Sequence, residues 1–128
     1  MYTLIEKILK EDRFSKFRVV PQYPLKMIIK DFDTLGLNTR ERKYAGNLHT
    51  KLDFLIENKM NKSPVLAIEV DGVTYHNENT AQFERDKLKN HILEICGIKL
   101  QRFATDGSQE KEELIKLLEE NLILDSKR

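Results

Sequence analysis

The sequence predicts an α/β fold in which helices flank a mixed sheet of four strands. Apolar residues recur at helical spacing near both ends of the chain, and two strand-like segments lie close together at its centre. A helical pattern and a further strand follow the second of these segments, an order typical of a parallel strand pair. With 128 residues and 40% hydrophobic content, one modest core and a single domain over residues 1–128 are expected.

Composition narrows the class of protein. Lys and Arg total 22 against 21 Asp and Glu, so the whole chain has no strong field to attract a polyanion, and any affinity for nucleic acid must come from local clusters. The lone Cys96 cannot form an internal disulfide or a thiolate zinc site, which indicates a reducing compartment. No apolar run approaches the roughly 20 residues that span a bilayer. A cytoplasmic protein without membrane contact is expected, because no signal pattern opens the chain.

The first fifth of the chain predicts a helix and then an edge strand. Thr3 and Glu6 have the spacing of a capping box. The apolar residues that continue at helical spacing are Leu4, Ile5, Ile8 and Leu9. Residues 17–23 are typical of a strand, and Pro21 and Pro24 place it at a sheet edge because proline has no amide donor.

Residues 36–50 are predicted to form an exposed basic loop. No apolar periodicity runs through this segment. Its basic residues, the one local concentration in the chain, are Arg40, Arg42, Lys43 and His49. Any nucleic-acid contact that depends on clustered positive charge is therefore expected here.

The centre of the chain predicts a β-hairpin. The alternation over residues 51–57 puts Leu52, Phe54 and Ile56 on one face and Asp53, Leu55 and Glu57 on the other. Residues 65–70 form an apolar run that only Glu69 interrupts, and the stretch between the two runs is rich in turn-forming residues. The two strands are therefore expected to pair directly.

A helix and a strand complete the predicted sheet. Thr80 can cap a helix that Gly97 ends. Its predicted core positions are Ala81, Leu88, Ile92 and Ile95, and its exposed face carries Gln82, Arg85, Asp86 and Lys89. Residues 98–103 then form a strand parallel to residues 65–70. A last helix near residues 109–124 buries Leu114, Leu117, Leu118 and Leu122 and exposes an acidic side.

Asp53 and Glu69 form the candidate site. If the hairpin is symmetric about Asn61, these two carboxylates lie opposite each other while Phe54 meets Ile68 on the other face. Like charges so placed destabilise a sheet unless something compensates them. A hard divalent cation such as Mg²⁺ would do so. The alternative is that an Arg or Lys neutralises the pair as a structural salt bridge.

Several motifs carry a resemblance to a known family. They are Leu52-Asp53-Phe54, Ala67-Ile68-Glu69-Val70-Asp71-Gly72, His76, Arg85-Asp86 and Gly97-Ile98-Lys99-Leu100-Gln101-Arg102-Phe103. In this order they resemble the very-short-patch-repair-like branch of the PD-(D/E)XK nuclease superfamily, and most of all its small domains that are often fused to helicases. The resemblance implies a restriction-endonuclease-like αβββαβ core. It also implies that Asp53 and Glu69 bind Mg²⁺ (or Mn²⁺), with the Val70 carbonyl as a further ligand and Glu6 as an accessory acidic residue.

One position departs from that superfamily. Members usually carry Lys two residues after the Glu, where this chain has Asp71. His76 is the candidate for accepting the proton of the attacking water, because an imidazole titrates near neutral pH, and Asp71 would orient it or ligate the ion. The following helix offers further accessory residues, which are Gln82, Arg85, Lys87 and Lys89.

The resemblance implies a Mg²⁺-dependent deoxyribonuclease of DNA repair, recombination or defence, with DNA as substrate and a helicase or repair protein as partner. The residues expected to contact the DNA backbone are Arg40, Arg42, Lys43 and Lys51. Two alternatives stay open. One is an inactive nuclease-like module that binds DNA or positions a helicase. The other is an interaction domain in which Asp53 and Glu69 form salt bridges.

Overall fold

The computed structural model describes residues 1–29, 31, 36–71, 81–104 and 110–123, with the backbone alone for Asp71, Gln82 and Ala104. The helices are α1 (Tyr2–Leu9), α2 (Thr39–Gly46), α3 (Ala81–Ile95) and α4 (Glu110–Leu118), which continues as a π-helical turn, Glu119–Ile123. The strands are β1 (Phe17–Pro24), β2 (Lys51–Asn58), β3 (Pro64–Asp71) and β4 (Lys99–Ala104). Short 3₁₀ turns occupy Asp12–Phe14 and Leu25–Met27.

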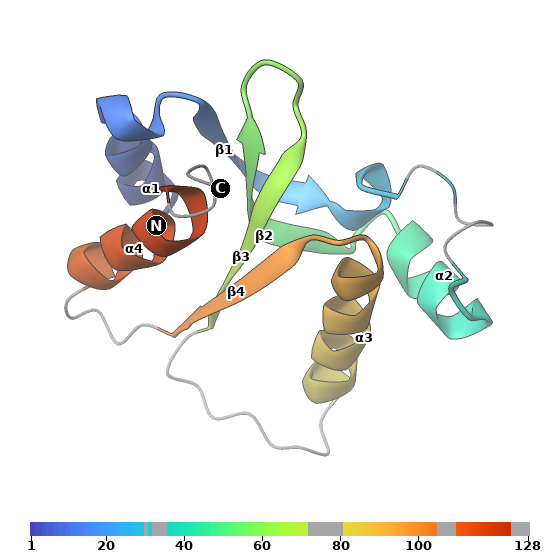
Figure 1. Cartoon of the computed structure of the whole chain (residues 1–128). Coiled ribbons are helices and arrows are strands. Elements are labelled where there is room, and N and C mark those ends of the chain that lie inside the picture. The colour runs from blue at the N-terminus through green and yellow to red at the C-terminus, as the bar shows by residue number, and fades with distance from the viewer. Residues whose placement is uncertain (30, 32–35, 72–80, 105–109, 124–128) are drawn as a thin grey trace.

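The four strands form one mixed sheet in the order β1-β2-β3-β4 (Figure 1). The β1–β2 and β2–β3 pairs are antiparallel, and β3 and β4 are parallel. The predicted hairpin, the edge position of β1 and the parallel pair joined through α3 are therefore confirmed. Gly97, at a φ of +75°, ends the α3 segment as expected, because a left-handed backbone suits glycine.

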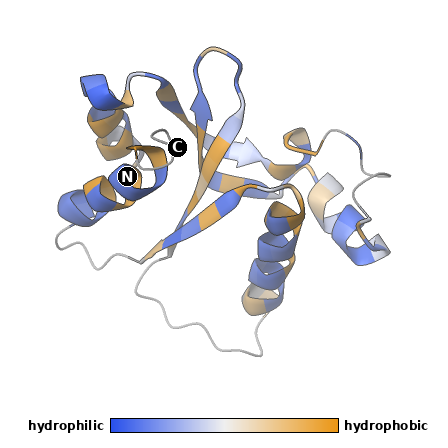
Figure 2. Ribbon diagram, viewed as in Figure 1, coloured by the Kyte–Doolittle hydropathy of each residue, from blue (hydrophilic) through white to orange (hydrophobic). Residues whose placement is uncertain are grey.

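Helices cover both faces of the sheet. A hydrophobic cluster on one face joins α1 and α4 to the strands through Phe54, Ile56 and Ile68. A second cluster on the other face joins α2 and α3 to Leu55 and Ala67. The hydrophobic residues lie along the strands and on the sheet-facing sides of the helices (Figure 2). This division follows from the alternation of side chains along each strand.

Three details of the sequence prediction are wrong. Leu52 packs in the cluster of α2 and α3, not with Phe54, because the regular β2–β3 pairing ends between these two residues. Ala81 is exposed and Leu93 is fully buried, since the C-terminal half of α3 supplies the core contacts. The capping box at Thr3 is absent: α1 begins after Met1 without a side-chain cap.

The segment predicted as a basic loop contains helix α2. Asn38 and Glu41 form a capping box, in which the Glu41 amide donates to Asn38 Oδ1 at 2.8 Å and the Asn38 amide donates to Glu41 Oε1 at 2.9 Å. Only Glu41 and Ala45 of this helix are buried. Two buried residues, one of them charged, make no apolar stripe, which is why the hydrophobic pattern gave no helical signal.

Glu41 also attaches α2 to α3. Its second carboxylate oxygen contacts Nδ1 of His91, so His91 has a structural role. The Asn38 amide is the main cause that lowers the pKa of Glu41, and His91 lowers it further. The charge of a buried capping residue therefore stabilises the α2–α3 contact.

Glu41→Gln is expected to lower the free energy of unfolding at neutral pH by about 1 kcal/mol, the usual contribution of a helix cap. Because the folded pKa of Glu41 is lowered, this stabilisation is present above pH 4.5, the ordinary value, and is lost as the pH falls through the folded pKa. Urea unfolding across acidic pH should show wild type and variant converging. A constant difference would mean that the Glu41 charge contributes nothing.

The last helix agrees with its prediction in part. Leu114, Leu118 and Leu122 are buried and Leu117 is partly buried. The exposed side is acidic, although Arg13 lies 3.5 Å from Glu119. None of the described helices has the length and apolar character needed to cross a membrane.

Candidate metal-binding and catalytic site

Asp53 and Glu69 are held together where β2 and β3 separate. The predicted register is confirmed, since Phe54 pairs with Ile68 and Ile56 with Leu66. Beyond the Phe54–Ile68 pair, carboxylates accept the hydrogen bonds of the backbone amides. The Asp53 amide donates to Glu69 Oε2 and the Val70 amide donates to Asp53 Oδ2, both at 2.9 Å. The backbone of each strand therefore fixes the carboxylate of the other.

Glu69 is the most unusual group of the site. Its side chain is only 5% exposed, and the ammonium of Lys89 contacts its Oε1. Burial is the main cause that raises the pKa of Glu69; Lys89 and the Asp53 amide oppose this, whereas the Asp53 carboxyl adds to it. The charged form of Glu69 is thus costly and depends on a nearby cation.

Of the accessory residues expected on α3, the structure brings Lys89 to the carboxylate pair. Its side chain is 13% exposed and reaches from α3 to Glu69 and to the Lys51 carbonyl, 3.0 Å from its Nζ. Lys89 is thus mostly buried, although the helical spacing predicts an exposed position for it. Lys89 is therefore part of the site.

The donor set fits a small divalent cation. If both carboxylates are ionised, they carry two negative charges against the single positive charge of Lys89, which leaves one negative charge uncompensated among these three groups. Mg²⁺ binds through one or two carboxylates and keeps several waters, which matches a pair of carboxylates. Among the described residues no group of three or more Asp, Glu, His or Cys could hold a metal. The Lys89–Glu69 contact is equally the salt bridge of the structural alternative.

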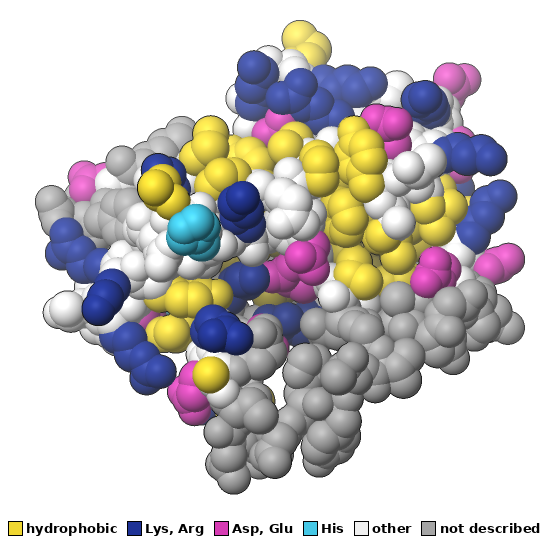
Figure 3. Space-filling view, turned by 180° about the vertical axis from the view of Figure 1, so that it is seen from behind, with side chains coloured by type: hydrophobic (Ala, Val, Ile, Leu, Met, Phe, Trp, Pro, Cys, Tyr) yellow, Lys and Arg dark blue, Asp and Glu magenta, His cyan; other side chains and the backbone are white. Residues whose placement is uncertain are grey.

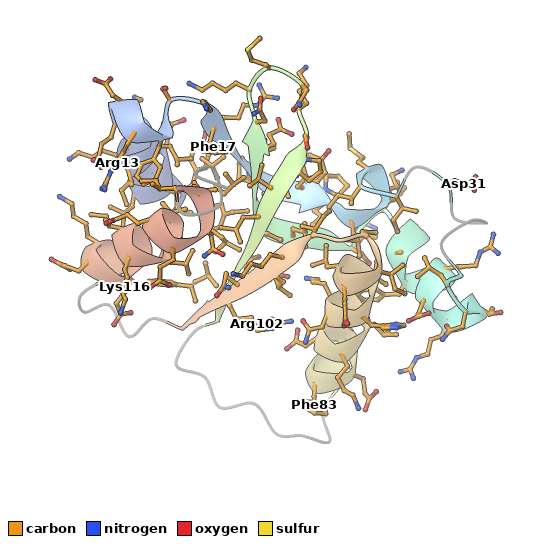
Figure 4. All side chains as sticks on the ribbon, in the orientation of Figure 1. Arg13, Phe17, Asp31, Phe83, Arg102 and Lys116 are labelled. Atoms are coloured by element: carbon orange, nitrogen blue, oxygen red, sulfur yellow. The ribbon has the colours of Figure 1, made fainter. Side chains whose placement is uncertain are left out.

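Arg102 lies beside Glu69 on the neighbouring strand. The parallel register pairs Glu69 with Arg102. The guanidinium turns toward α3, where Nη2 donates to Asn90 Oδ1 at 2.8 Å and Nη1 lies 3.7 Å from Asp86 Oδ1 (Figure 4). Arg102 thus provides a fixed positive charge on the Glu69 side of the sheet.

Tyr44 adds α2 to the site. Burial is the main cause that raises the pKa of its hydroxyl to about 12, and the negative charges of Glu69 and Asp86 add to the shift. Tyr44 therefore stays a neutral donor at any ordinary pH. The sequence gives no sign that Tyr44 belongs to the site, because residues 36–50 are predicted to form a loop. Arg102 could not be assigned to the site either, because only the parallel register places it beside Glu69.

Two other expected site residues, Glu6 and Lys87, make no contact with the carboxylate pair within the described part of the chain. Glu6 lies on α1, which covers the opposite face, and accepts a hydrogen bond from the Tyr2 hydroxyl at 2.8 Å. Arg85 and Lys87 are exposed on α3, and Lys87 lies 5.3 Å above the Phe83 ring. His76 and the side chains of Asp71 and Gln82 lie outside the described residues. Val70, whose carbonyl is expected to be a metal ligand, contacts the carboxylate pair through its amide.

The expected DNA-contacting residues lie on α2 and at the start of β2. Arg40, Arg42 and Lys43 are exposed on α2, and Arg40 lies 3.8 Å from Glu84 of α3. Lys51 is exposed at the start of β2, and its carbonyl accepts from Lys89. Helix α2 contacts α3, the helix that carries Lys89, so three of these cations lie on the helix next to it.

Comparison with known proteins gives a family and no function. No curated protein and no solved structure matches the chain. A protein-family model matches residues 1–122, which include every described strand and nearly all of the described helices. The match therefore spans both core clusters and the Asp53–Glu69 pair. The chain belongs to the family described as Protein of unknown function (DUF2726).

Proposed function

We propose that this protein is a Mg²⁺-dependent deoxyribonuclease of the PD-(D/E)XK type, acting in DNA repair, recombination or defence. The observation that carries the proposal is the contact of Lys89 with Glu69 beside Asp53. The Asp, Glu and Lys typical of that superfamily are thus brought together from β2, β3 and α3. The element order supports the proposal, because α1, β1, β2, β3, α3 and β4 follow the αβββαβ order once α2 is counted as an insertion.

Asp53 and Glu69 would hold the metal in this reaction. A bound divalent ion supplies a water of lowered pKa and polarises a phosphoryl oxygen. The Asp53 and Val70 amides keep the two carboxylates in place, so little reorganisation is needed when the ion binds. Arg102, the register partner of Glu69, and Tyr44, whose pKa the charge of Glu69 raises, would offer a positive charge and a neutral donor to a phosphate.

Lys89 would take the part of the missing superfamily lysine. Asp71 stands two residues after Glu69, where an ammonium is usual. Lys89 reaches the same carboxylate from α3, where it favours the ionised form of Glu69 and can orient the attacking water. His76 keeps its proposed role as proton acceptor.

Reversing Arg40, Arg42 and Lys43 to Glu is expected to weaken binding to duplex DNA of any sequence and to flatten its dependence on salt. Each lost phosphate contact lowers the slope of log K against log salt by about 0.9. Fluorescence anisotropy at several salt concentrations measures this slope. A control that reverses the exposed Lys111 and Lys116 of α4 should keep the wild-type slope. Equal slopes in all three proteins would remove α2 from the interface.

Asp71 favours a second candidate, a nuclease-like module that binds DNA for a helicase or repair protein without cutting it. The two candidates differ in one measurement. Incubation of circular and branched DNA with the protein and Mn²⁺ should yield cleavage that a chelator stops. Binding without cleavage under these conditions would favour the inactive module.

A further inference from the structure

A cavity lies between α1 and β1. Its volume is about 520 Å³, and its floor is formed by core side chains such as Leu9, Phe17 and Val19. Polar and charged side chains line its margin, namely Tyr2, Glu6, Lys10, Arg18 and Lys59. A cavity of this size with an apolar floor can take a flat, ring-shaped group.

Positive charge dominates the margin. Lys10 and Lys59 are exposed, and neither pairs with a carboxylate within the described ranges. Arg18 pairs with Glu57, but the Glu57 side chain is 4% exposed and that of Arg18 is 45% exposed, so the positive group faces outward. The face of the molecule seen from behind shows hydrophobic side chains below a dense group of Lys and Arg (Figure 3).

The β2–β3 hairpin extends this charge. Lys59 begins its turn, and the Lys59 amide donates to the Lys16 carbonyl at 2.9 Å, which places two lysines side by side. Lys62 lies in the same turn and is exposed. A chain of regularly spaced negative charges leaving the cavity would therefore meet these lysines in succession.

The outer edge of β1 is a poor partner for an added peptide strand. Pro21 and Pro24 have no amide to donate, and Gln22 has a φ of 51°, which breaks the regular strand backbone. At most the four residues before Pro21 offer a continuous edge. The side chains of the cavity are thus better placed to bind a ligand than the strand edge is.

From these observations we infer that the cavity between α1 and β1 binds a segment of single-stranded nucleic acid. One base would lie on the apolar floor beside the Tyr2 ring, which its hydroxyl bond to Glu6 holds in place. Lys10, Lys59 and the hairpin lysines would contact the phosphates. Stacking on an aromatic ring together with backbone cations is the usual way in which proteins bind single strands.

This inference rests on the proposed function for the nature of the ligand, and it narrows the substrate. The cavity lies on the α1 side of the sheet, whereas Glu69 faces α3. A substrate that contacts both would combine a duplex with an unpaired segment, as a flap or a branched junction does.

The test measures binding of a fluorescent oligothymidylate of about 12 nucleotides, within the usual range of site sizes, in chelator so that no cleavage occurs. Tyr2→Ala is expected to weaken binding about ten-fold, the usual effect of losing one stacking ring. The double variant K10Q/K59Q should lower the salt slope by about 1.4, or 0.7 for each lost contact to a single strand. The matched control K111Q/K116Q removes two exposed lysines of α4 and should bind as wild type does.

Three results would overturn the inference: wild-type binding by both cavity variants, an equal loss in the control, or tighter binding of an oligoglutamate peptide that Tyr2→Ala abolishes. The circular dichroism spectrum should stay unchanged, because Tyr2, Lys10 and Lys59 are exposed. If the oligonucleotide binds as expected but no DNA is cut, only the nuclease proposal fails. If DNA is cut while the cavity variants bind normally, only the cavity assignment fails.

Discussion

Glu69→Gln is expected to lower metal-dependent DNA cleavage by about 10³-fold or more while the protein stays folded. A catalytic metal contributes several kcal/mol to the transition state, and the neutral amide is a poor ligand for it. The side-chain oxygen of the new Gln can still accept a hydrogen bond from the Asp53 amide, so this contact between β2 and β3 is kept. Asp53→Asn should act in the same way, since it keeps an acceptor for the Val70 amide.

Calorimetric titration with Mn²⁺ and urea unfolding separate the metal site from the salt bridge. In a metal site both variants lose ion affinity and activity, and Asp53→Asn keeps a free energy of unfolding close to that of wild type. Glu69→Gln also removes the charge that Lys89 contacts, so it lowers stability in either case. In a structural ion pair, removing one charge leaves the other buried and costs roughly 3–5 kcal/mol. Marked destabilisation by both substitutions, without any change in Mn²⁺ binding, would refute the metal site.

Lys89→Met should lower cleavage by about 10² to 10³, the usual cost of one preorganised donor in an active site. Because Lys89 lowers the pKa of Glu69, its loss should also move the acid limb of the pH–rate profile to higher pH. His76→Ala differs in its expected result. As the loss of a general base it should lower the rate by about 10² to 10⁴ and leave Mn²⁺ affinity nearly intact.

Lys87→Met is the matched control, because Lys87 lies on the same helix but is exposed. It should leave both the rate and the pH profile unchanged. Adding Asp71→Lys to Lys89→Met tests whether the ammonium itself matters, since this restores a lysine at the usual superfamily position. An unchanged rate in Lys89→Met would exclude Lys89 from the reaction and leave water activation to His76 alone.

Lys89→Met also has a predicted pH dependence of stability. The folded pKa of Glu69 is already raised in the wild-type protein, so protonation favours the folded state and this gain is lost as the pH rises through the folded pKa. Without Lys89 the pKa of Glu69 rises further. The difference in stability between wild type and variant should therefore be largest at neutral pH and small at acidic pH.

The sheet could be predicted from the sequence because the two central strands have strong patterns. Both strands could be located from the alternation in residues 51–57 and the apolar run in residues 65–70. The pairing of Phe54 with Ile68 follows from the same two patterns. A one-residue shift would have moved every buried side chain to the wrong face. The same register brings Asp53 and Glu69 together.

The helices that complete the site could not be predicted in this way. Helix α2 buries a glutamate through a cap and an ion pair with His91, a kind of burial that hydrophobic patterns do not detect. Lys89 has the spacing of an exposed residue, and only the crossing of α3 over the strand ends turns it inward. Arg102 depends on the parallel register with β3, which no local pattern encodes.

Where the pairing of β2 and β3 ends, two backbone amides can report whether the carboxylates have bound an ion. The amide protons of Asp53 and Val70 each point at a carboxylate oxygen of the opposite strand. A cation that draws electron density from those oxygens must weaken both hydrogen bonds, and both amide resonances would shift together in a nitrogen–proton correlation spectrum. A ligand elsewhere on the surface would leave this pair of signals in place. The backbone itself can thus be read as an indicator of occupancy, without a label and without turnover.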